Sequence, residues 1–410
     1  MSQGETVMQA PLTYGWIDKA AKRMTQALLA HLGEGQLIVK EQGKLVGHYG
    51  DKSSDLCAEI NVLDAKFYVR LLTGGSIGAA ELFIDKAWET PNLTAVIQVF
   101  ARNMDALDKL ERKVAWLTFP INKYRHWANR NHKAQAKKNI SAHYDLGNEL
   151  YTRFLDTNMQ YSSALFLQGN ETLEQAQLNK MDRLCRKLEL KPRDHLLEIG
   201  TGWGGLAIFA AQNYGCQVTT TTISEEQYQY VAERIKSLGL EDRITLLKED
   251  YRDLTGQYDK LVSVEMIEAV GKRYLPGFFQ VCNDRLKQNG LMCIQAITIA
   301  DQRYASYSRS VDFIQKHIFP GGFLPSLSLM TDLFKKETSL VVRDVRDFGE
   351  SYAKTLAAWR DRFNGRAGEL EQFGYDARFS RLWNYYFGYC EGGFLEKTVS
   401  VVQVTASKTS

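Results

Sequence analysis

The run Leu196-Leu-Glu-Ile-Gly200-Thr-Gly202-Trp-Gly204-Gly205 decides the fold of this chain. It places a glycine-rich turn directly between an apolar strand and a helical stretch over 206–212. Glycine permits positive φ and close approach of the backbone, while the start of a helix offers unpaired amides. The run lacks the full GxGxxG spacing, and the chain holds no phosphate-loop motif. It therefore predicts a nucleotide site of the shorter kind that is typical of methyltransferases.

Strand-like and helix-like runs alternate around this turn. The strand-like runs cover 195–199, 217–223, 244–248, 260–264 and 291–299. Such alternation predicts a doubly wound, Rossmann-like α/β sheet. An aromatic-rich insert over 303–334 follows, and we expect it to serve as a lid or a substrate-binding element. Two last strands are expected at 340–345 and 398–404.

The length of 410 residues predicts two domains, because a single hydrophobic core stops growing below that size. Residues 1–112 predict a small α+β accessory domain. Its strand-like runs are 37–40, 56–63 and 67–72. Basic and aromatic residues are interleaved over 113–140, which predicts a linker. Residues 141–410 are expected to form the nucleotide-binding domain.

Composition narrows the class of protein. Hydrophobic residues make up 44% and charged residues 24%, as in a globular protein. The net charge of +3 is too small to indicate a nucleic-acid partner. The six cysteines form no CxxC pair and we expect no secretory leader, which favours the reducing cytoplasm. No stretch approaches the roughly 20 apolar residues that span a bilayer, so we expect peripheral contact at the inner membrane face.

Two more strand ends support a nucleotide site. The second strand ends in Thr220-Thr-Thr-Ile-Ser224-Glu-Glu-Gln227 rather than in the single acid that usually holds a ribose. Hydroxyl groups or Gln227 are expected to serve instead. The third strand ends at Glu249-Asp250-Tyr251-Arg252, where an adenine would lie. His143 has no partner at ligand spacing, so we expect a hydrogen-bonded histidine and no metal site.

Six further motifs accompany the glycine-rich run. They are His143-Tyr-Asp-Leu-Gly-Asn148, Met159-Gln-Tyr-Ser-Ser163, Asp250-Tyr-Arg-Asp253, Ser263-Val-Glu-Met-Ile-Glu-Ala-Val-Gly271, Ile318-Phe-Pro-Gly-Gly-Phe-Leu-Pro325 and Asp347-Phe-Gly349. Together they resemble the cyclopropane-fatty-acyl-phospholipid synthase family over nearly the whole chain. The resemblance implies a class I methyltransferase with S-adenosylmethionine as the donor and a cis double bond of a phospholipid acyl chain as the acceptor. It also implies that the accessory domain helps lipid engagement or formation of a homodimer.

The resemblance further implies the site residues. Those that would contact the cofactor are Tyr161, Ser162, Gly200, Gly202, Thr222, Gln227, Asp250, Tyr251 and Arg252. In this family a bicarbonate ion acts as the base, and five positions hold it. In this chain they are Ser163, Glu268, Gln295, Ile297 and Tyr352.

This chain departs from the family pattern near the base. Ser163 stands where the family has cysteine, and Gln295 where it has histidine. Glu265 and Ala269 replace a glycine and a histidine on either side of Glu268. Gln295 can still donate an amide hydrogen to an anion. We expect Glu268 to be the active-site carboxylate and Glu265 to orient its neighbours, a version that resembles the plant-like branch of the family.

The chemistry leaves several products open. Methyl transfer to an alkene creates a carbocation that must be shielded and then lose a proton. The insert offers aromatic faces for this, or ordinary core residues, at Tyr304, Tyr307, Phe313, Phe319 and Phe323. The position of the base decides between a cyclopropane and a methylene- or methyl-branched chain. Less favoured alternatives are a small-molecule N-methyltransferase and a lipid-binding protein without catalysis.

Overall fold

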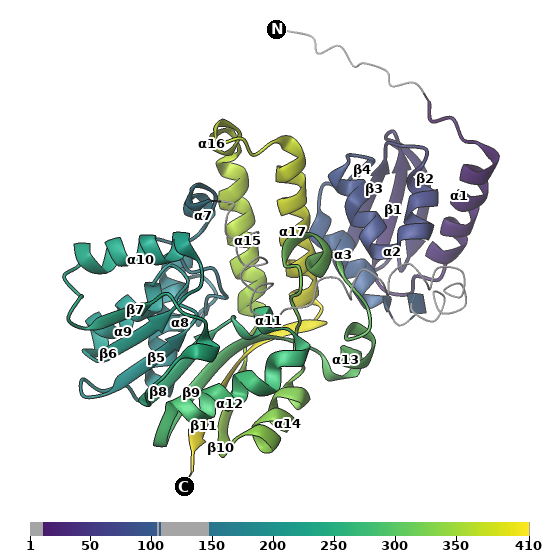
Figure 1. Cartoon of the computed structure of the whole chain (residues 1–410). Coiled ribbons are helices and arrows are strands. Elements are labelled where there is room, and N and C mark those ends of the chain that lie inside the picture. The colour runs from purple at the N-terminus through teal and green to yellow at the C-terminus, as the bar shows by residue number, and fades with distance from the viewer. Residues whose placement is uncertain (1–10, 105, 108–146, 410) are drawn as a thin grey trace. The chain divides into compact units, whose positions relative to one another are not determined.

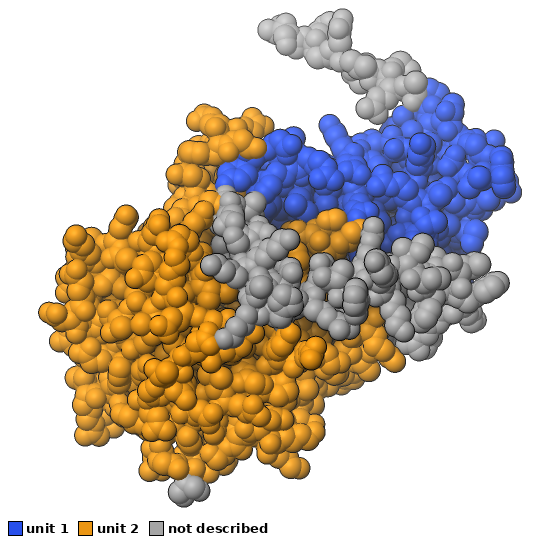
Figure 2. Space-filling view, viewed as in Figure 1, with its two compact units in different colours: residues 1–122, 375–396 blue, residues 123–374, 397–410 orange. Residues whose placement is uncertain are grey.

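The computed structural model describes residues 11–104, 106–107 and 147–409. The chain divides into two compact units, which Figure 2 distinguishes by colour. The first unit comprises residues 1–122 and 375–396, and the second comprises 123–374 and 397–410. The predicted linker and His143 lie outside the described residues.

The first unit is built on a four-stranded sheet in the order β2-β1-β3-β4. Strand β1 pairs antiparallel with β2 and parallel with β3. Along β1, Leu37 and Val39 are buried while their neighbours are less so, the alternation of a half-buried strand. The elements of this unit are α1 (Trp16–Leu29), β1 (Gln36–Glu41), β2 (Lys44–Gly50), β3 (Cys57–Val62), α2 (Phe67–Ile84), β4 (Trp88–Glu89), α3 (Leu93–Arg102) and α17 (Ala377–Leu395).

Because of helix α17, the division of the chain into two units differs from the predicted domain boundaries. Residues 375–396 were expected in the nucleotide-binding domain, yet they belong to the first unit. There α17 lies along α3, where Thr94 Oγ1 donates a hydrogen bond of 2.8 Å to Glu391. A Cβ at Gly392 would lie 2.7 Å from a side chain of α3, so the two helices approach very closely. Contacts with residues nearly 300 positions away therefore decide where this helix belongs.

Helix α2 corrects two expectations. Residues 67–72 were expected to form a strand, but α2 begins at Phe67. Among the described residues α2 is the one helix long and apolar enough to cross a membrane by length and composition, contrary to the expectation that no segment is. Its chain breaks helical geometry at Gly75, and Tyr68, Leu82 and Ile84 are buried in the unit. We therefore describe α2 as a kinked core helix of this unit.

The second unit contains a seven-stranded sheet in the order β10-β11-β9-β8-β5-β6-β7. Neighbouring strands from β9 to β7 run parallel, while β11 is antiparallel to both β9 and β10. The strands are β5 (His195–Ile199), β6 (Gln217–Thr221), β7 (Ile244–Leu247), β8 (Tyr258–Val264), β9 (Leu286–Ile299), β10 (Leu340–Asp347) and β11 (Val399–Lys408). All seven runs predicted for this unit are strands, and the predicted Rossmann-like fold class is confirmed (Figure 1).

Helices of the second unit join its strands and pack against the sheet through two hydrophobic clusters. One cluster includes Phe278, Phe279 and Phe334, and the other includes Leu184 and Ala207. The helices are α7 (Asn148–Phe154), α8 (Leu173–Lys187), α9 (Gly205–Tyr214), α10 (Glu225–Ser237), α11 (Ile267–Val270), α12 (Leu275–Arg285), α13 (Asp301–Tyr307), α14 (Leu327–Glu337), α15 (Gly349–Gly365) and α16 (Ala367–Gln372). The insert thus comprises α13, a π-helical turn over Ile314–Ile318 and most of α14.

Candidate active site

The glycine-rich turn connects the carboxyl end of β5 to α9. Gly200, Gly202 and Gly204 have φ of 97°, 53° and 81°, values that residues with side chains rarely adopt. A Cβ at Gly204 would lie 2.9 Å from Val231 on α10, whereas one at Gly202 would meet nothing within 4 Å. The turn is therefore tightly packed on one side and faces open space on the other.

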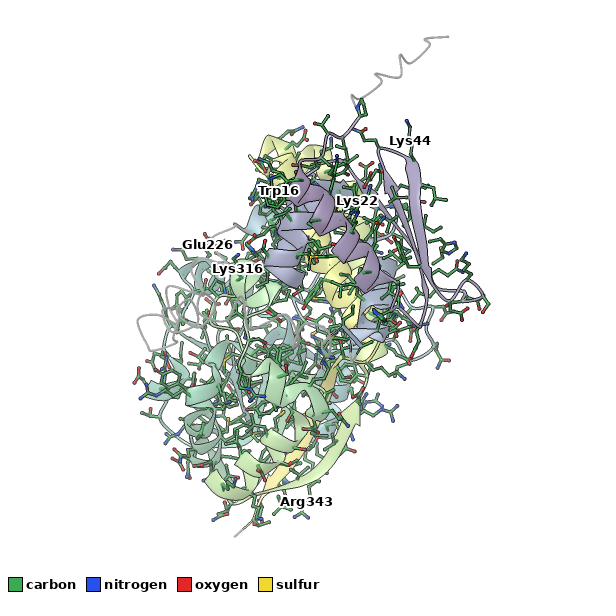
Figure 3. The ribbon with its side chains drawn as sticks, turned by 90° about the vertical axis from the view of Figure 1, so that its right-hand side faces the viewer. Trp16, Lys22, Lys44, Glu226, Lys316 and Arg343 are labelled. Carbon is green, nitrogen blue, oxygen red and sulfur yellow. The ribbon has the colours of Figure 1, made fainter. Side chains whose placement is uncertain are left out.

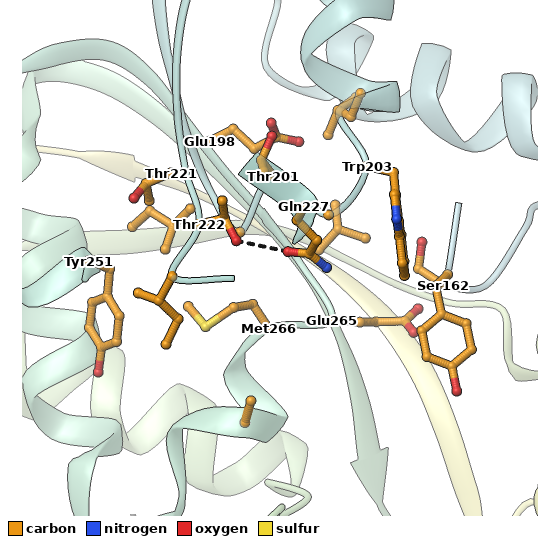
Figure 4. Close-up of a pocket in the computed structure, with 18 of the residues that line it drawn as sticks. Ser162, Glu198, Thr201, Trp203, Thr221, Thr222, Gln227, Tyr251, Glu265 and Met266 are labelled. Carbon is orange, nitrogen blue, oxygen red and sulfur yellow. Dashed lines mark hydrogen bonds between the residues drawn. The ribbon is translucent and has the colours of Figure 1, made fainter. Parts of the chain in front are cut away.

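That open space belongs to the pocket drawn in Figure 4. Nine of the residues that line it are those predicted to contact the cofactor: Tyr161, Ser162, Gly200, Gly202, Thr222, Gln227, Asp250, Tyr251 and Arg252. Thr222 Oγ1 donates to Gln227 Oε1 at 2.8 Å, the bond dashed in Figure 4. The Ser224 hydroxyl accepts from the Gln227 N–H and caps α10. Polar groups from three strand ends thus meet beside the glycines, an arrangement that fits a nucleoside.

The turn after β7 is held in one conformation by an ion pair. Arg252 Nε and Nη2 donate to the two carboxylate oxygens of Asp250, each at 2.7 Å. The Arg252 N–H also donates to Asp250, at 3.0 Å. Tyr251 packs edge-on against Phe278, with ring centroids 5.5 Å apart. The predicted adenine cluster is therefore a rigid aromatic and polar wall.

A buried lysine that the sequence reasoning missed supports the opposite wall. Lys180 on α8 has no exposed surface, and its Nζ donates to Ser162 Oγ at 2.8 Å and to Gln160 Oε1 at 2.5 Å. Burial lowers the pKa of Lys180 to about 8, although the nearby charge of Glu265 opposes this. The available signal was a charged residue within the apolar stripe of an amphipathic helix.

Glu198 is a second residue that the sequence reasoning missed. It interrupts the apolar strand β5, is buried, and lines the pocket. Thr220 Oγ1 donates to its carboxylate at 2.6 Å. Burial raises the pKa of Glu198 to about 8, more than this hydrogen bond lowers it. In the sequence, Glu198 could have been recognised as a single acidic residue within an apolar strand.

The residues predicted to hold an anion gather around two partly buried carboxylates, Glu265 and Glu268. Glu265 Oε1 accepts hydrogen bonds from the Ser163 N–H at 2.9 Å and from Gln295 Nε2 at 2.8 Å. Its Oε2 accepts from the Tyr352 hydroxyl at 2.8 Å. Glu265 also lines the cofactor pocket, where Figure 4 shows its carboxylate beside Ser162. Three of the five predicted anion-holding groups therefore donate to a side chain of the protein itself.

The other two predicted residues pair with each other. Glu268 Oε1 accepts from the Ile297 N–H at 2.5 Å, and within the described part of the chain Glu268 Oε2 has no hydrogen-bond partner. Gln403 on β11, which the sequence reasoning missed, donates to Gln295 Oε1 at 2.9 Å. This bond turns the amide NH2 of Gln295 toward Glu265. The site is thus assembled from the loop that holds Ser163, the turn and α11 after β8, and β9, β11 and α15, which no local pattern brings together.

Glu268, the second carboxylate, is expected to make the free energy of unfolding of the protein depend on pH. Burial raises the pKa of Glu268 from its ordinary 4.5 to about 8, and the charge of Glu265 adds to the effect. The folded protein thus keeps a proton that the unfolded chain releases, so the free energy of unfolding falls as the pH rises toward 8. We expect Glu268→Gln, which cannot titrate, to gain on the wild type by roughly 1 kcal/mol per pH unit between about pH 5 and about pH 8. Urea unfolding across that range measures this, and a constant difference would contradict it.

The aromatic insert contributes to the site only in part. Phe319 lies 6.4 Å from the ring of Tyr161, which lines the pocket, and Trp359 of α15 lies 5.3 Å from the same ring. By contrast, Tyr304 and Phe323 hold the Lys272 ammonium over their faces at 5.4 and 5.9 Å. Of the five predicted insert aromatics the last two are Phe313, which packs on His317, and Tyr307, which packs on Phe323. Phe319 therefore packs beside the pocket, against the ring of Tyr161.

Known proteins are similar to this chain in sequence and in fold. The family model described as mycolic acid cyclopropane synthetase matches residues 131–404. A tuberculostearic acid methyltransferase of Mycobacterium tuberculosis is 39% identical over 339 residues, covering 81% of this chain and 78% of the relative. The cyclopropane-fatty-acyl-phospholipid synthase of Escherichia coli is 36% identical over 363 residues, covering 86% of this chain and 88% of the relative.

Solved structures agree with the sequence comparison. A mycolic acid cyclopropane synthase complexed with SAH and CTAB matches with a TM-score of 0.62 and 27% identity, over 68% of this chain and 99% of that one. A coclaurine N-methyltransferase at 18% identity matches with a TM-score of 0.61 and shows the shared fold alone. The resemblance read from the motifs is confirmed, and the protein is an S-adenosylmethionine-dependent methyltransferase. The chain belongs to the mycolic acid cyclopropane synthetase family.

Proposed function

We propose that this enzyme adds the methyl carbon of S-adenosylmethionine to a cis double bond of a phospholipid acyl chain and closes a cyclopropane. The observation that carries the proposal is the partly buried carboxylate Glu265, which lies at the wall of the cofactor pocket. A carboxylate there can take a proton from a substrate carbon close to the methyl donor. The name of the Escherichia coli relative supports the same acceptor.

The residues around the pocket suit methyl transfer to an alkene. When bound, S-adenosylmethionine supplies an electrophilic methyl group. An isolated alkene is a weak nucleophile, so its cation must be kept from water until a proton leaves. The rings of Tyr161, Phe319 and Trp359 form an aromatic cluster at the pocket, and aromatic faces attract cations. These residues shield the reacting carbons, while Glu265 receives the proton.

Incubation with unsaturated phospholipid vesicles tests the proposal. We expect the acyl chains to gain one CH2 unit by mass spectrometry and to show cyclopropyl protons by NMR. Vesicles of saturated phospholipid are the control and should gain nothing. A gain of CH2 without a cyclopropyl signal would reject ring closure and establish a methylene-branched product.

That branched product is the second candidate, and the name of one relative favours it. The relative at 39% identity is named for tuberculostearic acid rather than for a cyclopropane. The same assay separates the two candidates, since only ring closure gives cyclopropyl protons.

We also propose that the enzyme works from the cytoplasm as a peripheral protein on the inner membrane face. Trp16, Ile17 and Met24 of α1 are exposed, Trp16 by 81% (Figure 3). Lys19 and Arg23 on the same helix are exposed as well. Tryptophan and basic side chains suit an anionic lipid interface. Sedimentation with anionic vesicles should remove the protein from solution, and equal binding to zwitterionic vesicles would contradict the electrostatic part.

A further inference from the structure

The groups expected to donate hydrogen bonds to a bicarbonate ion already donate them to carboxylates of the protein. The Ser163 N–H, the Gln295 amide and the Tyr352 hydroxyl all donate to the Glu265 carboxylate, at 2.8 to 2.9 Å. An N–H or O–H group carries one hydrogen, and the Gln295 NH2 places its second toward the Ser163 carbonyl at 3.3 Å. The fourth donor, the Ile297 N–H, bonds to Glu268. A bicarbonate ion would therefore have to displace the protein's own carboxylate from these groups.

The backbone at this position is adapted to hold the carboxylate there. Glu265 has a φ of 48°, in the left-handed region that favours glycine. A non-glycine residue persists in such a conformation only where its surroundings hold it, and such residues cluster at functional sites. Glu265 thus combines a turn conformation that favours glycine with a side chain whose carboxylate takes up three of the donors.

Glu265 rather than Glu268 is the charged member of the pair. Three donors stabilise the ionised form of Glu265, whereas Glu268 receives one. Burial raises the pKa of Glu265 above its ordinary value, and the three hydrogen bonds and the buried ammonium of Lys180 oppose this effect. The negative charge of Glu265 in turn raises the pKa of Glu268, so Glu268 keeps the proton. In addition, Glu265 lines the cofactor pocket.

We propose that Glu265 is the resident general base of this enzyme and that turnover does not require bicarbonate. This inference rests on the proposed function. The π electrons of the alkene form the new bond to the methyl carbon, and the electron pair of the broken S–C bond stays on sulfur. For ring closure, a C–H bond of the transferred methyl group breaks, and its electron pair joins the methyl carbon to the cationic carbon. For a methylene branch, a hydride first shifts from the methylated carbon to the cationic carbon, and the electron pair of the methyl C–H bond then forms the double bond. In either case the proton goes to a Glu265 oxygen, from which water removes it between turnovers.

Three variants test the base directly in buffer freed of carbon dioxide. The wild type should turn over at the same rate with and without added bicarbonate. Glu265→Gln keeps the shape but cannot accept the proton, so turnover should fall about 100-fold, with no recovery on adding bicarbonate or formate. Glu265→Gly opens the site and relaxes the backbone, so turnover should fall similarly but recover at least tenfold with either anion. Glu268→Gln mimics a protonated Glu268 and should keep at least ten times the turnover of Glu265→Gln.

Each result supports or overturns the proposal. Bicarbonate-dependent turnover of the wild type, near-normal turnover of Glu265→Gln, or a Glu265→Gly variant that no anion rescues would each overturn it. Thermal unfolding and calorimetric binding of S-adenosylhomocysteine confirm that the variants are folded.

A binding measurement separates this inference from the proposed function. The NMR line of 13C-bicarbonate should broaden with Glu265→Gly and remain sharp with the wild type and with Glu265→Gln. Broadening by the wild type would overturn the inference whatever the lipid assay shows. A wild type that gives no lipid product but leaves the line sharp would reject the proposed function and uphold the filled anion site.

Discussion

Replacing Lys180 with methionine is expected to lower the free energy of unfolding by about 3 kcal/mol. The Lys180 ammonium is fully buried, and the charges of Asp156, Glu198 and Glu265 act on it. Removing the cation leaves nearby carboxylate charge, chiefly that of Glu265, without a compensating positive charge, which costs several kcal/mol in proteins. Denaturant unfolding at neutral pH measures the loss.

The same helix provides the control for this variant. Lys187 lies on α8 too, but it pairs at the surface with Asp344 at 2.8 Å. Exposed ion pairs contribute about 0–1 kcal/mol, so Lys187→Met should change stability little. Equal losses for Lys180→Met and Lys187→Met would show that the buried charge is not what matters. Because Lys180 also holds Ser162 at the pocket wall, we expect only the first variant to weaken cofactor binding.

The second large effect is expected from Gly205→Ala, which should weaken binding of S-adenosylhomocysteine at least tenfold. A Cβ at Gly205 would lie 2.3 Å from Gln160 Nε2 and 2.6 Å from the carbonyl oxygen of Asn158. A backbone atom cannot move aside cheaply, so the segment leading to Tyr161 must shift. Overpacking of this kind costs about 1–3 kcal/mol, and 1.4 kcal/mol corresponds to tenfold in affinity. Calorimetric titration measures the effect.

A glycine elsewhere in the same unit controls for the substitution itself. Gly277 lies in α12, where a Cβ would meet nothing within 4 Å. Gly277→Ala should leave affinity unchanged and can raise stability slightly, because alanine favours helix. If Gly205→Ala bound the cofactor as tightly as Gly277→Ala does, the close packing of the turn against 158–160 would not be required for the pocket.

The parts of this fold that were predicted correctly depend on local patterns. The strands of the second unit are short apolar runs bounded by turns, and the run over 196–205 joins a strand to a helix within ten residues. Parallel strands bring their carboxyl ends to one edge, so the residues after β5, β6 and β7 were expected to meet, and they line one pocket. The predicted strands and turn agree with the structure because residues close in sequence determine them.

The predictions that differ from the structure concern distant residues. Residues 67–72 are rich in the aromatic and branched side chains of strands, yet tertiary packing makes them helical. Helix α17 was assigned by its place in the chain, although its partners precede it by nearly 300 residues. The three donors to Glu265 could not be predicted as a group, because Ser163, Gln295 and Tyr352 are far apart in the chain. A polar network drawn from such distant segments has no periodicity in sequence.

Helix α17 also has a consequence for how the protein is made. A ribosome releases the amino-terminal strands and helices long before residues 377–395 exist. Until then the surface that α17 covers on α3 faces water, so the first unit cannot finish folding before nearly the whole chain has been made. During synthesis the first unit therefore completes its fold only after α17 has been made. Nascent chains stalled before residue 377 should be open to proteases or chaperones at the uncovered surface of α3.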